Sequence, residues 1–381
     1  MRRWLMISVS FLVLLGFFCP QVRGTDLQLE AKSALLMDVS TGRVLYEQNA
    51  HQALPPASVT KVMTMLLIME AIDSGRIQPG DMVTASENAA AKGGSQVYLK
   101  AGETMSVTDM LKAIAVSSAN DCACAMAEHI AGSEAAFVET MNRRAAELGM
   151  ENTHFVNCTG LDDSEAAREH KTSAYDIALM SRQLLLYHPQ IKQYTTIWMD
   201  SLRDGQFGLS NTNKMVRFYP GCTGLKTGFT SEAQYCLSAS AQRDGMELIA
   251  VVMGCETSQK RFSACKAMLD HGFAGYTLIR PEVSALSVPV KLGSADWVSA
   301  VPAEDTPLLI DKGQKNDVTF HTELETQVSA PVSKGQRLGT LTVKAGQQVL
   351  SQIPLVAESS VSRLTFGQIL WGVLKKVTMS A

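Results

Sequence analysis

The sequence lacks the features that would identify several broad classes of protein. Aromatic residues make up only 6% of its 381 residues, and charged residues make up 19%. No block of basic residues occurs and the formal net charge is −3, which argues against a nucleic-acid partner, because such proteins carry clustered Lys and Arg. Glycine and proline number 27 and 12, too few for a collagenous or low-complexity chain. The length itself predicts two domains, or three.

The signatures of common hydrolases are also missing. There is no Gly-x-Ser-x-Gly, no His-Glu-x-x-His, no phosphate-binding glycine-rich loop and no paired-cysteine zinc set. His154 is more typical of a loop or packing residue than of a ligand. Cys122 and Cys124 would lie on nearly opposite faces of a helix, so we interpret the cysteines as small buried apolar residues. A catalytic site must therefore work without histidine, and we expect no metal and no cofactor.

The first 24 residues are typical of an export signal. Two arginines precede an apolar run of 15 residues, 4–18, which is shorter than the ~20 residues needed to span a bilayer. We expect cleavage after Gly24, with an uncleaved anchor as the alternative. Removing the three arginines of this segment leaves 31 basic and 37 acidic residues, a net charge of −6. The protein is predicted to be exported and to lie at the outer face of the cytoplasmic membrane.

Hydrophobic periodicity predicts both helices and strands in residues 25–281. The segment 57–70 is apolar nearly all round, so its helix should be deeply buried. The other helices are expected at residues 107–131 with an interruption near Ser117, 135–148, 173–187 and 261–273. Strands are expected at residues 34–37, 44–46, 234–241 and 246–253.

The composition changes after Pro281. Residues 282–358 contain short Val, Leu and Ile runs separated by turn residues, which predicts a small all-β domain, a sandwich or a barrel. Residues 359–381 include an amphipathic stretch in which Trp371 and Lys375 are typical of the headgroup level of a bilayer. We expect this tail to be a peripheral membrane-anchoring helix. The alternative is a helix that docks on the protein's own surface.

One hydrolytic chemistry needs neither histidine nor metal: a serine nucleophile with a neutral lysine as its base. Ser58 and Lys61 are three residues apart, which places them on the same face of a helix. The Met, Leu and Ile residues that follow would desolvate the lysine, and desolvation lowers a lysine pKa. Ser263 and Lys266 have the same spacing, so the pair alone is not specific.

Two further motifs follow in a definite order. Ser118-Ala-Asn120 begins 60 residues after Ser58, and Lys226-Thr-Gly begins 106 residues after Asn120 and occurs only once. Taken singly, each has an alternative interpretation. Ser118 and Asn120 could cap the helix that follows them, and Lys226 could be a solvated strand lysine.

In this order and spacing the three motifs resemble those of the penicillin-recognising serine enzymes. The export signal, the β-rich domain and the tail resemble the D-alanyl-D-alanine carboxypeptidase branch, the low-molecular-mass penicillin-binding proteins. The resemblance covers essentially the whole mature chain. It implies an α+β catalytic domain of the β-lactamase/transpeptidase type, with an antiparallel sheet built from the N-terminal hairpin and residues 221–253. Helices should cover both faces, with a helical subdomain at residues 80–215 and a β-rich stalk after Pro281.

The resemblance also implies a role for each motif residue. Ser58 would attack the carbonyl between the two terminal D-alanines of a peptidoglycan stem pentapeptide and form an acyl-enzyme, while Lys61 takes its proton. Ser118 would pass a proton towards the leaving D-alanine, and Asn120 would hydrogen-bond the substrate amide. Lys226 would bind the substrate carboxylate through its positive charge and keep Lys61 neutral. β-Lactam antibiotics are implied as covalent inhibitors.

The remaining implied residues bind and polarise the substrate. Thr227 and Gly228 would lie on an edge strand beside which the extended peptide binds by strand addition. The backbone N–H groups of Ser58 and Phe229 would form the oxyanion hole. Arg261, 35 residues after Lys226, would anchor the terminal carboxylate of the substrate.

Three other functions are compatible with part of this pattern. A class A β-lactamase needs a deacylating Glu in a Glu-x-x-Leu-Asn segment, and Glu151, Glu165 and Glu169 lack that context, so penicillin should inhibit this chain. A D,D-endopeptidase acting on crosslinked peptidoglycan would use the same residues. The intact motifs argue against a non-catalytic wall-binding protein. A vegetative and a sporulation role are not distinguished by the sequence.

Overall fold

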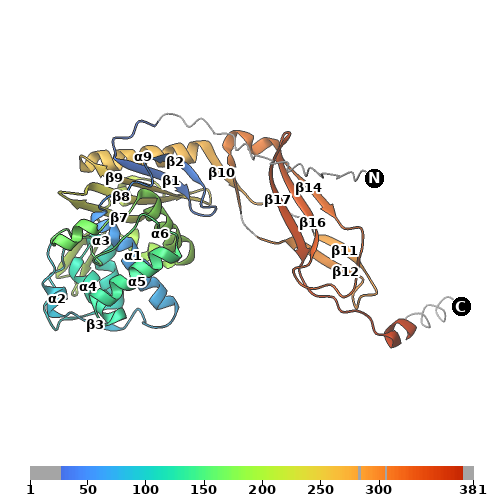
Figure 1. Cartoon of the computed structure of the whole chain (residues 1–381), viewed down its shortest axis with the longest axis horizontal. Coiled ribbons are helices and arrows are strands. Elements are labelled where there is room, and N and C mark those ends of the chain that lie inside the picture. Colours follow the sequence, from blue (N-terminus) through green and yellow to red (C-terminus); the bar gives the residue numbers. More distant parts are fainter. Residues whose placement is uncertain (1–26, 282–284, 305–306, 372–381) are drawn as a thin grey trace, which may run out of the picture.

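We describe the chain from a computed structural model, which covers residues 27–281, 285–304 and 307–371. Figure 1 shows a larger part, in which helices cover a sheet, beside a smaller and elongated part made of strands. The predicted export signal, residues 1–24, lies outside the described residues.

The larger part is built on a five-stranded antiparallel sheet with the strand order β2-β1-β9-β8-β7. Its strands are β1 (Ser33–Asp38), β2 (Val44–Gln48), β7 (Cys222–Thr230), β8 (Gln234–Arg243) and β9 (Met246–Cys255). Every residue of β9 is buried, because this strand lies inside the sheet and both faces are covered. Strand β7 forms one edge of the sheet, so one row of its backbone N–H and C=O groups has no strand partner.

Helices cover both faces of this sheet, and each face has its own hydrophobic core. The longer helices are α1 (Lys61–Asp73), α3 (Val107–Ser117), α4 (Asn120–Ala131), α5 (Glu134–Glu147), α6 (Ala174–Tyr187) and α9 (Ser258–Gly275). The short ones are α2 (Glu87–Ala90), α7 (Lys192–Thr195), α8 (Met215–Phe218) and the 3₁₀ turns η1 (Ala57–Thr60), η2 (Glu165–Glu169) and η3 (Pro189–Ile191). Two small hairpins, β3 (Met82–Thr84) with β4 (Thr104–Ser106) and β5 (Met199–Leu202) with β6 (Phe207–Ser210), lie among the helices.

Helix α1 is the centre of the larger core. Ten of its 13 residues are buried, and it packs against α3, α4, α5, α6 and β7. Its nearly continuous apolar sequence is therefore explained by neighbours on all sides. The prediction of a deeply buried helix is confirmed, although its first turn is the 3₁₀ turn η1. The predicted interruption near Ser117 is also confirmed, since α3 ends at that residue and α4 begins at Asn120.

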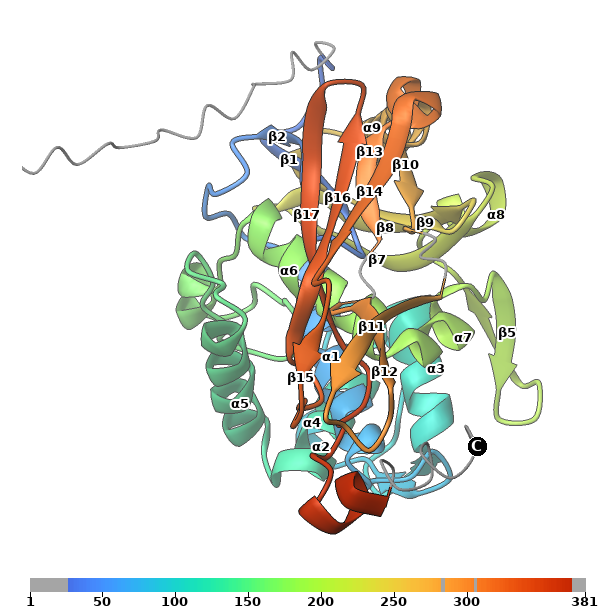
Figure 2. The ribbon, with the colours of Figure 1, turned by 90° about the vertical axis from the view of Figure 1, so that its right-hand side faces the viewer.

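The smaller part is a six-stranded sheet with the order β14-β16-β17-β12-β11-β15. Its strands are β11 (Leu286–Lys291), β12 (Trp297–Pro302), β14 (Val318–Leu324), β15 (Val328–Ser329), β16 (Arg337–Ala345) and β17 (Gln348–Ala357). The chain passes between the parts through β10 (Tyr276–Ile279), which pairs with β13 (Leu308–Asp311) before the turn η4 (Lys312–Asp317). The boundary predicted at Pro281 falls just after β10. In Figure 2, the β16–β17 turn and the last helix lie at opposite ends of this part.

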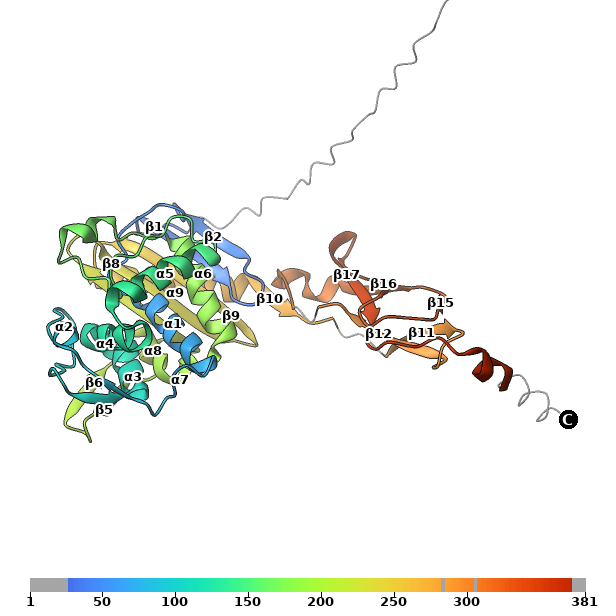
Figure 3. The ribbon, with the colours of Figure 1, turned by 60° about the horizontal axis from the view of Figure 1, so that its bottom comes forward.

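The described part of the tail ends in a helical segment, residues 366–371. Thr365 caps it, because the Thr365 hydroxyl accepts a hydrogen bond from Gln368 N while Gln368 Oε1 accepts one from Thr365 N. Figure 3 shows this helix beyond the β-rich part, at the end that leads to the C-terminus. The rest of the predicted tail helix lies outside the described residues. Among those that are described, no helix has the length and apolar composition needed to cross a bilayer.

Candidate active site

The turn η1 brings Ser58 and Lys61 into direct contact. Pro56 precedes the turn, and the i,i+3 spacing places the Lys61 Nζ 3.0 Å from Ser58 Oγ. The same Nζ donates a hydrogen bond to the Thr159 carbonyl oxygen at 2.7 Å. Lys61 has no exposed surface, and burial lowers the pKa of its ammonium group to about 7. At neutral pH a large fraction of this amine is therefore able to accept a proton.

Ser118 and Asn120 lie at the junction between α3 and α4, which both pack against α1. Ser118 adopts the left-handed conformation with φ of 64°, and its buried Oγ has no hydrogen-bond partner among the described residues. Asn120 donates from Nδ2 to the Gly93 carbonyl at 2.7 Å, while its buried Oδ1 has no partner in the part of the chain that the structure describes. Neither residue caps α4, whose N-cap is Ala119, so the capping interpretation is wrong. Two unsatisfied polar atoms are thus available to a bound molecule.

The third motif lies on the edge strand β7, which packs on η1. Lys226 is only 1% exposed and donates from Nζ to the Thr227 carbonyl at 2.9 Å, so it is not a solvated lysine. Thr227 Oγ1 donates to Thr212 Oγ1 at 2.7 Å, and Phe229 is half exposed over the Tyr235 ring.

Gly228 permits the close approach of β7 to η1. A Cβ at this position would lie 2.6 Å from the Pro56 carbonyl oxygen and 3.1 Å from Val59. Only glycine lets the strand pass so near the turn that carries Ser58.

Arg261 reaches β7 from α9, on the opposite face of the sheet from α1. Its Nη1 donates to the carbonyl oxygens of Gly228 at 2.9 Å and Cys236 at 3.3 Å. Its guanidinium lies over the rings of Tyr235 and Phe262, and its buried Nε has no partner. The side chain therefore supports the backbone of β7 at Gly228, two residues from Lys226, and its charge acts on Lys226.

The two lysines and Arg261 are basic groups that interact in a buried region. Burial is the largest cause of the low Lys61 pKa, which nearby Cys158 and Asp121 raise slightly. Burial also holds the pKa of Lys226 well below its usual range, and the charges of Lys61 and Arg261 lower it further. An anion bound beside Lys226 would reverse that effect, because an opposite charge favours the ammonium form.

Sequence analysis missed the loop that completes the Lys61 site. Asn157 Oδ1 accepts hydrogen bonds from Thr159 N at 3.1 Å and Gly160 N at 2.7 Å, which fixes the carbonyl that faces Lys61. Gly160 has φ of 79°, and a Cβ there would lie 1.9 Å from the Ala57 carbonyl oxygen. The Asn-x-x-Gly spacing is typical of an Asx turn, so the turn could have been found, though not its contact with η1.

His170 was missed as well. Its Nδ1 accepts a hydrogen bond from Val156 N at 3.0 Å, and its Nε2 lies 2.8 Å from Thr60 Oγ1. Since Nδ1 is an acceptor, Nε2 carries the proton and donates to Thr60. The Thr60 hydroxyl in turn donates to the Ala57 carbonyl at 2.8 Å. His170 thereby joins the turn that carries Ser58 to the loop that faces Lys61.

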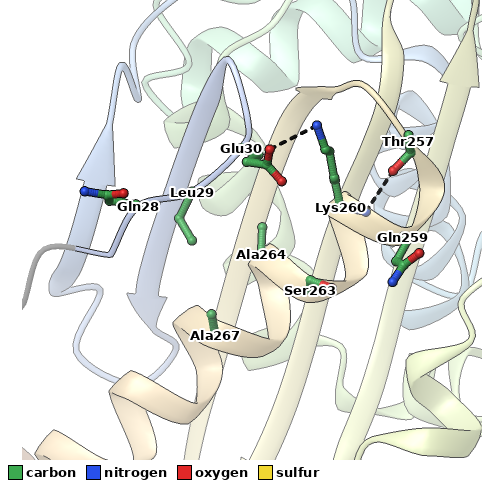
Figure 4. Close-up of a pocket in the computed structure, with 9 residues that line it drawn as sticks. All are labelled: Gln28, Leu29, Glu30, Thr257, Gln259, Lys260, Ser263, Ala264 and Ala267. Carbon is green, nitrogen blue, oxygen red and sulfur yellow. Dashed lines mark hydrogen bonds and ion pairs between the residues drawn. The ribbon is translucent and has the colours of Figure 1, made fainter.

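The second Ser-x-x-Lys pair lies elsewhere. Ser263 lines a separate cavity of about 480 Å³ between the N-terminal segment and α9 (Figure 4). The lysine in that cavity is Lys260, which forms an ion pair with Glu30 at 3.0 Å, and Lys266 is exposed to solvent. Neither amine has the buried, unpaired environment of Lys61, so this pair lacks an activated base.

Comparison with known proteins identifies the family. Residues 20–257 match the D-alanyl-D-alanine carboxypeptidase family, and residues 276–363 match the C-terminal domain of penicillin-binding protein 5. The chain is 45% identical over 351 residues to the D-alanyl-D-alanine carboxypeptidase DacF of Bacillus subtilis, covering 90% of this chain and 89% of that protein. The crystal structure of penicillin binding protein 5 from Haemophilus influenzae aligns with a TM-score of 0.77 at 31% identity, covering 89% of this chain and 99% of that one. Penicillin-binding protein D2 of Listeria monocytogenes, solved in an ampicillin-bound form, aligns with a TM-score of 0.60 at 33% identity, covering 65% and 100%. The chain therefore belongs to the D-alanyl-D-alanine carboxypeptidase family of peptidases.

Proposed function

We propose that this protein is a serine-type D-alanyl-D-alanine carboxypeptidase that removes the terminal D-alanine from peptidoglycan stem pentapeptides through an acyl-enzyme on Ser58. The observation that carries the proposal is the contact between Ser58 Oγ and the buried Lys61 Nζ at 3.0 Å. The pKa of that amine is lowered to about 7, close to the value at which a general base is most effective near neutral pH. Family membership supports the same activity.

In the first step, Ser58 Oγ forms a bond to the carbonyl carbon between the two D-alanines, and its proton passes to Lys61 Nζ. The backbone N–H groups of Ser58 and Phe229 stabilise the oxyanion. The C–N bond then breaks as Ser118 relays the proton held by Lys61 to the amine of the departing D-alanine, which leaves Lys61 neutral. Water then attacks the remaining ester and its proton passes to Lys61. The ester C–O bond breaks, Lys61 returns that proton to Ser58 Oγ, and the shortened peptide leaves.

The substrate lies along the free edge of β7 as an added strand, where Thr227 and Gly228 supply backbone groups. Asn120 Oδ1, buried without a partner, accepts a hydrogen bond from the substrate amide. The terminal carboxylate binds beside Lys226 and within the field of Arg261. Because this carboxylate raises the pKa of Lys226, binding restores the positive charge that burial disfavours.

The same site makes β-lactams covalent inhibitors. A β-lactam acylates Ser58, and its ester persists when the site lacks the glutamate base with which a class A β-lactamase activates a deacylating water. The three acids considered for that task, Glu151, Glu165 and Glu169, are all exposed to solvent, which suits a penicillin target better than a β-lactamase.

Labelling with a fluorescent penicillin tests the nucleophile. We expect Ser58→Ala to abolish covalent labelling of the protein band on a denaturing gel. Ser263→Ala is the matched control, because Ser263 belongs to the other Ser-x-x-Lys pair, and its labelling should equal that of the parent chain. Labelling that survives Ser58→Ala would exclude Ser58 as the acylated residue.

Product analysis tests the reaction. Incubation with a stem pentapeptide should release free D-alanine and leave a tetrapeptide. Cleavage of a crosslinked dimer with the pentapeptide left intact would instead identify a D,D-endopeptidase. Rapid hydrolysis of a chromogenic cephalosporin would identify a β-lactamase.

The location follows from the two ends of the chain. The export signal carries the protein across the cytoplasmic membrane, and residues 359–381 hold it on the outer leaflet as a peripheral anchor. The exposed Phe366 and Trp371 support this placement, since both are on the described turn of the tail helix and aromatic side chains favour the bilayer interface. The β-rich part acts as a stalk between the anchor and the active site.

A further inference from the structure

The exposed large apolar side chains of the β-rich part are gathered at one of its ends. Among the described residues after Pro281, seven such side chains are exposed. Five of them lie in the terminal helix or in the β11–β12 connection, by which we mean residues 292–296 and Trp297, the first residue of β12: Leu292, Trp297, Phe366, Leu370 and Trp371. The other two lie near the β16–β17 turn. Phe320 pairs with Val343 on β16, and Val349 pairs with Lys344 across the turn. Figure 2 shows that turn at the end opposite the terminal helix.

The tail is fastened to the β11–β12 connection by backbone hydrogen bonds. Ser294 N donates to the Ser362 carbonyl at 2.8 Å, and Leu364 N donates to the Leu292 carbonyl at 2.9 Å. The terminal helix begins at Phe366, only two residues beyond the second of these bonds. The helix and the connection are therefore held together as one end of the domain.

The backbone of Leu292 adopts an unfavourable conformation. Its φ of 59° lies in the left-handed region, which costs a non-glycine residue energy. Its side chain is nevertheless exposed, as is Trp297, which is 59% exposed at the first position of β12. Within the described residues, neither side chain is part of the hydrophobic core of the β-rich part.

Two of the three charged residues in segments 286–297 and 359–371 are basic. Lys291 and Arg363 are exposed beside Leu292 and the tail. Asp296 is the only acid in residues 286–297, and residues 359–371 contain none. Tryptophan with basic residues at the edge of an apolar patch is typical of a surface that contacts anionic lipid headgroups.

We propose that the β11–β12 connection, through Leu292 and Trp297, forms a second contact with an anionic lipid bilayer beside the terminal helix. The inference rests on the proposed membrane anchoring and adds a fixed orientation to it. A single helix would let the β-rich part pivot about residue 365. Two contacts at the same end, the terminal helix and the β11–β12 connection, make the domain stand on the bilayer by this end, with the β16–β17 turn pointing away.

The chain's own tryptophans provide the test. It contains Trp4, Trp198, Trp297 and Trp371, so replacing three of them by phenylalanine leaves one fluorophore at a known place. One variant of the full chain keeps Trp297, a second keeps Trp371, and a third has no natural tryptophan but carries Phe320→Trp as a matched control in the same domain. Each is bound to vesicles of anionic phospholipid with brominated acyl chains, which quench nearby tryptophan. Covalent penicillin labelling confirms that each variant is folded.

We expect Trp297 and Trp371 to be quenched and the Phe320→Trp fluorophore not to be. Quenching of Trp371 without Trp297 would overturn the second contact and leave the anchor intact. Equal quenching at all three positions would mean that the domain lies flat, which also contradicts the proposal. If neither Trp297 nor Trp371 is quenched, the anchoring itself fails, and the second contact with it.

A partition measurement gives an independent readout. The double variant Leu292→Ser, Trp297→Ser should bind anionic vesicles about tenfold more weakly than the parent chain, since it loses two apolar contacts with the lipid. Phe320→Ser should bind like the parent. Equal binding by all three proteins would contradict the proposal.

Discussion

At the scale of single residues, the site depends on a buried lysine whose amine donates hydrogen bonds to the Ser58 hydroxyl and the Thr159 carbonyl. Burial lowers the pKa of Lys61 to about 7, so the amine is neutral above that pH and protonated below it. We predict that the rate of acylation by penicillin rises about tenfold per pH unit below 7 and levels off above it. The rate of acylation by penicillin, measured at a series of pH values, gives this profile.

The matching variant is Lys61→Arg, which keeps a positive charge at every accessible pH. It should lose acylation by about a thousandfold or more, since general-base catalysis is removed. A flat pH profile for the parent chain, or a rapid Lys61→Arg variant, would contradict the assignment of Lys61 as the base.

His170 is a positioning residue at the same scale. Burial lowers its pKa to about 4, whereas an unfolded histidine titrates near pH 6.5. Between these two pH values the unfolded chain is protonated at this ring and the folded chain is not. The free energy of unfolding therefore decreases as the pH falls from about 6.5 to about 4, by up to about 3 kcal/mol. Urea unfolding at pH 7 and pH 4.5 measures this loss.

Two substitutions of His170 separate its effect on the acylation rate from its effect on stability. His170→Ala leaves Val156 N and Thr60 Oγ1 without their partner, which should destabilise the fold by about 1–3 kcal/mol and slow acylation. His170→Gln can restore one of these bonds and should recover part of the rate, and neither variant should show the acid-dependent loss assigned to the ring. An unchanged pH dependence of stability in both would locate that loss elsewhere.

At the scale of elements, the site is the meeting of a turn and an edge strand. Gly228→Ala would place a Cβ 2.6 Å from the Pro56 carbonyl oxygen, which pushes β7 away from η1. We predict about a hundredfold slower acylation, because a displacement of about 1 Å between reacting groups costs that much. Gly208→Ala on β6 is the matched control, since its Cβ meets nothing within 4 Å. Equal rates for the two variants would show that the close approach is not required.

At the scale of the whole molecule, the catalytic part and the tail are separated by the β-rich part, as Figure 3 shows. We predict that deletion of residues 365–381 releases the protein into the soluble fraction with unchanged pentapeptide turnover. This truncation keeps the Leu364–Leu292 hydrogen bond, so the new C-terminus stays bound to the β11–β12 connection. Cell fractionation measures the release. Release also requires that the second contact at Leu292 and Trp297 is too weak to hold the protein alone. Retained membrane association that survives Leu292→Ser and Trp297→Ser in the truncated chain would point to an uncleaved N-terminal segment.

Much of the element pattern could be predicted, because it depends on local periodicity. The burial of helix α1, the break after Ser117 and the β8–β9 hairpin all follow from neighbouring residues in the sequence. The contact of Thr159 with Lys61 spans 98 positions, and the bond between His170 and Thr60 spans 110. No local pattern encodes such contacts, so those residues were not found.

The sequence by itself determined which chemistry is possible. The three-residue spacing of Ser58 and Lys61 places the serine hydroxyl beside the lysine amine. Two further motifs in a fixed order indicate the family and its substrate. Only the tertiary structure decided the state of that amine. Lys61 acquires a pKa near neutrality because helices and a loop from distant parts of the chain exclude water from it. Likewise, Ser118 Oγ and Asn120 Oδ1 are unsatisfied only because the fold buries them, and desolvation is a property of the packed molecule rather than of any segment.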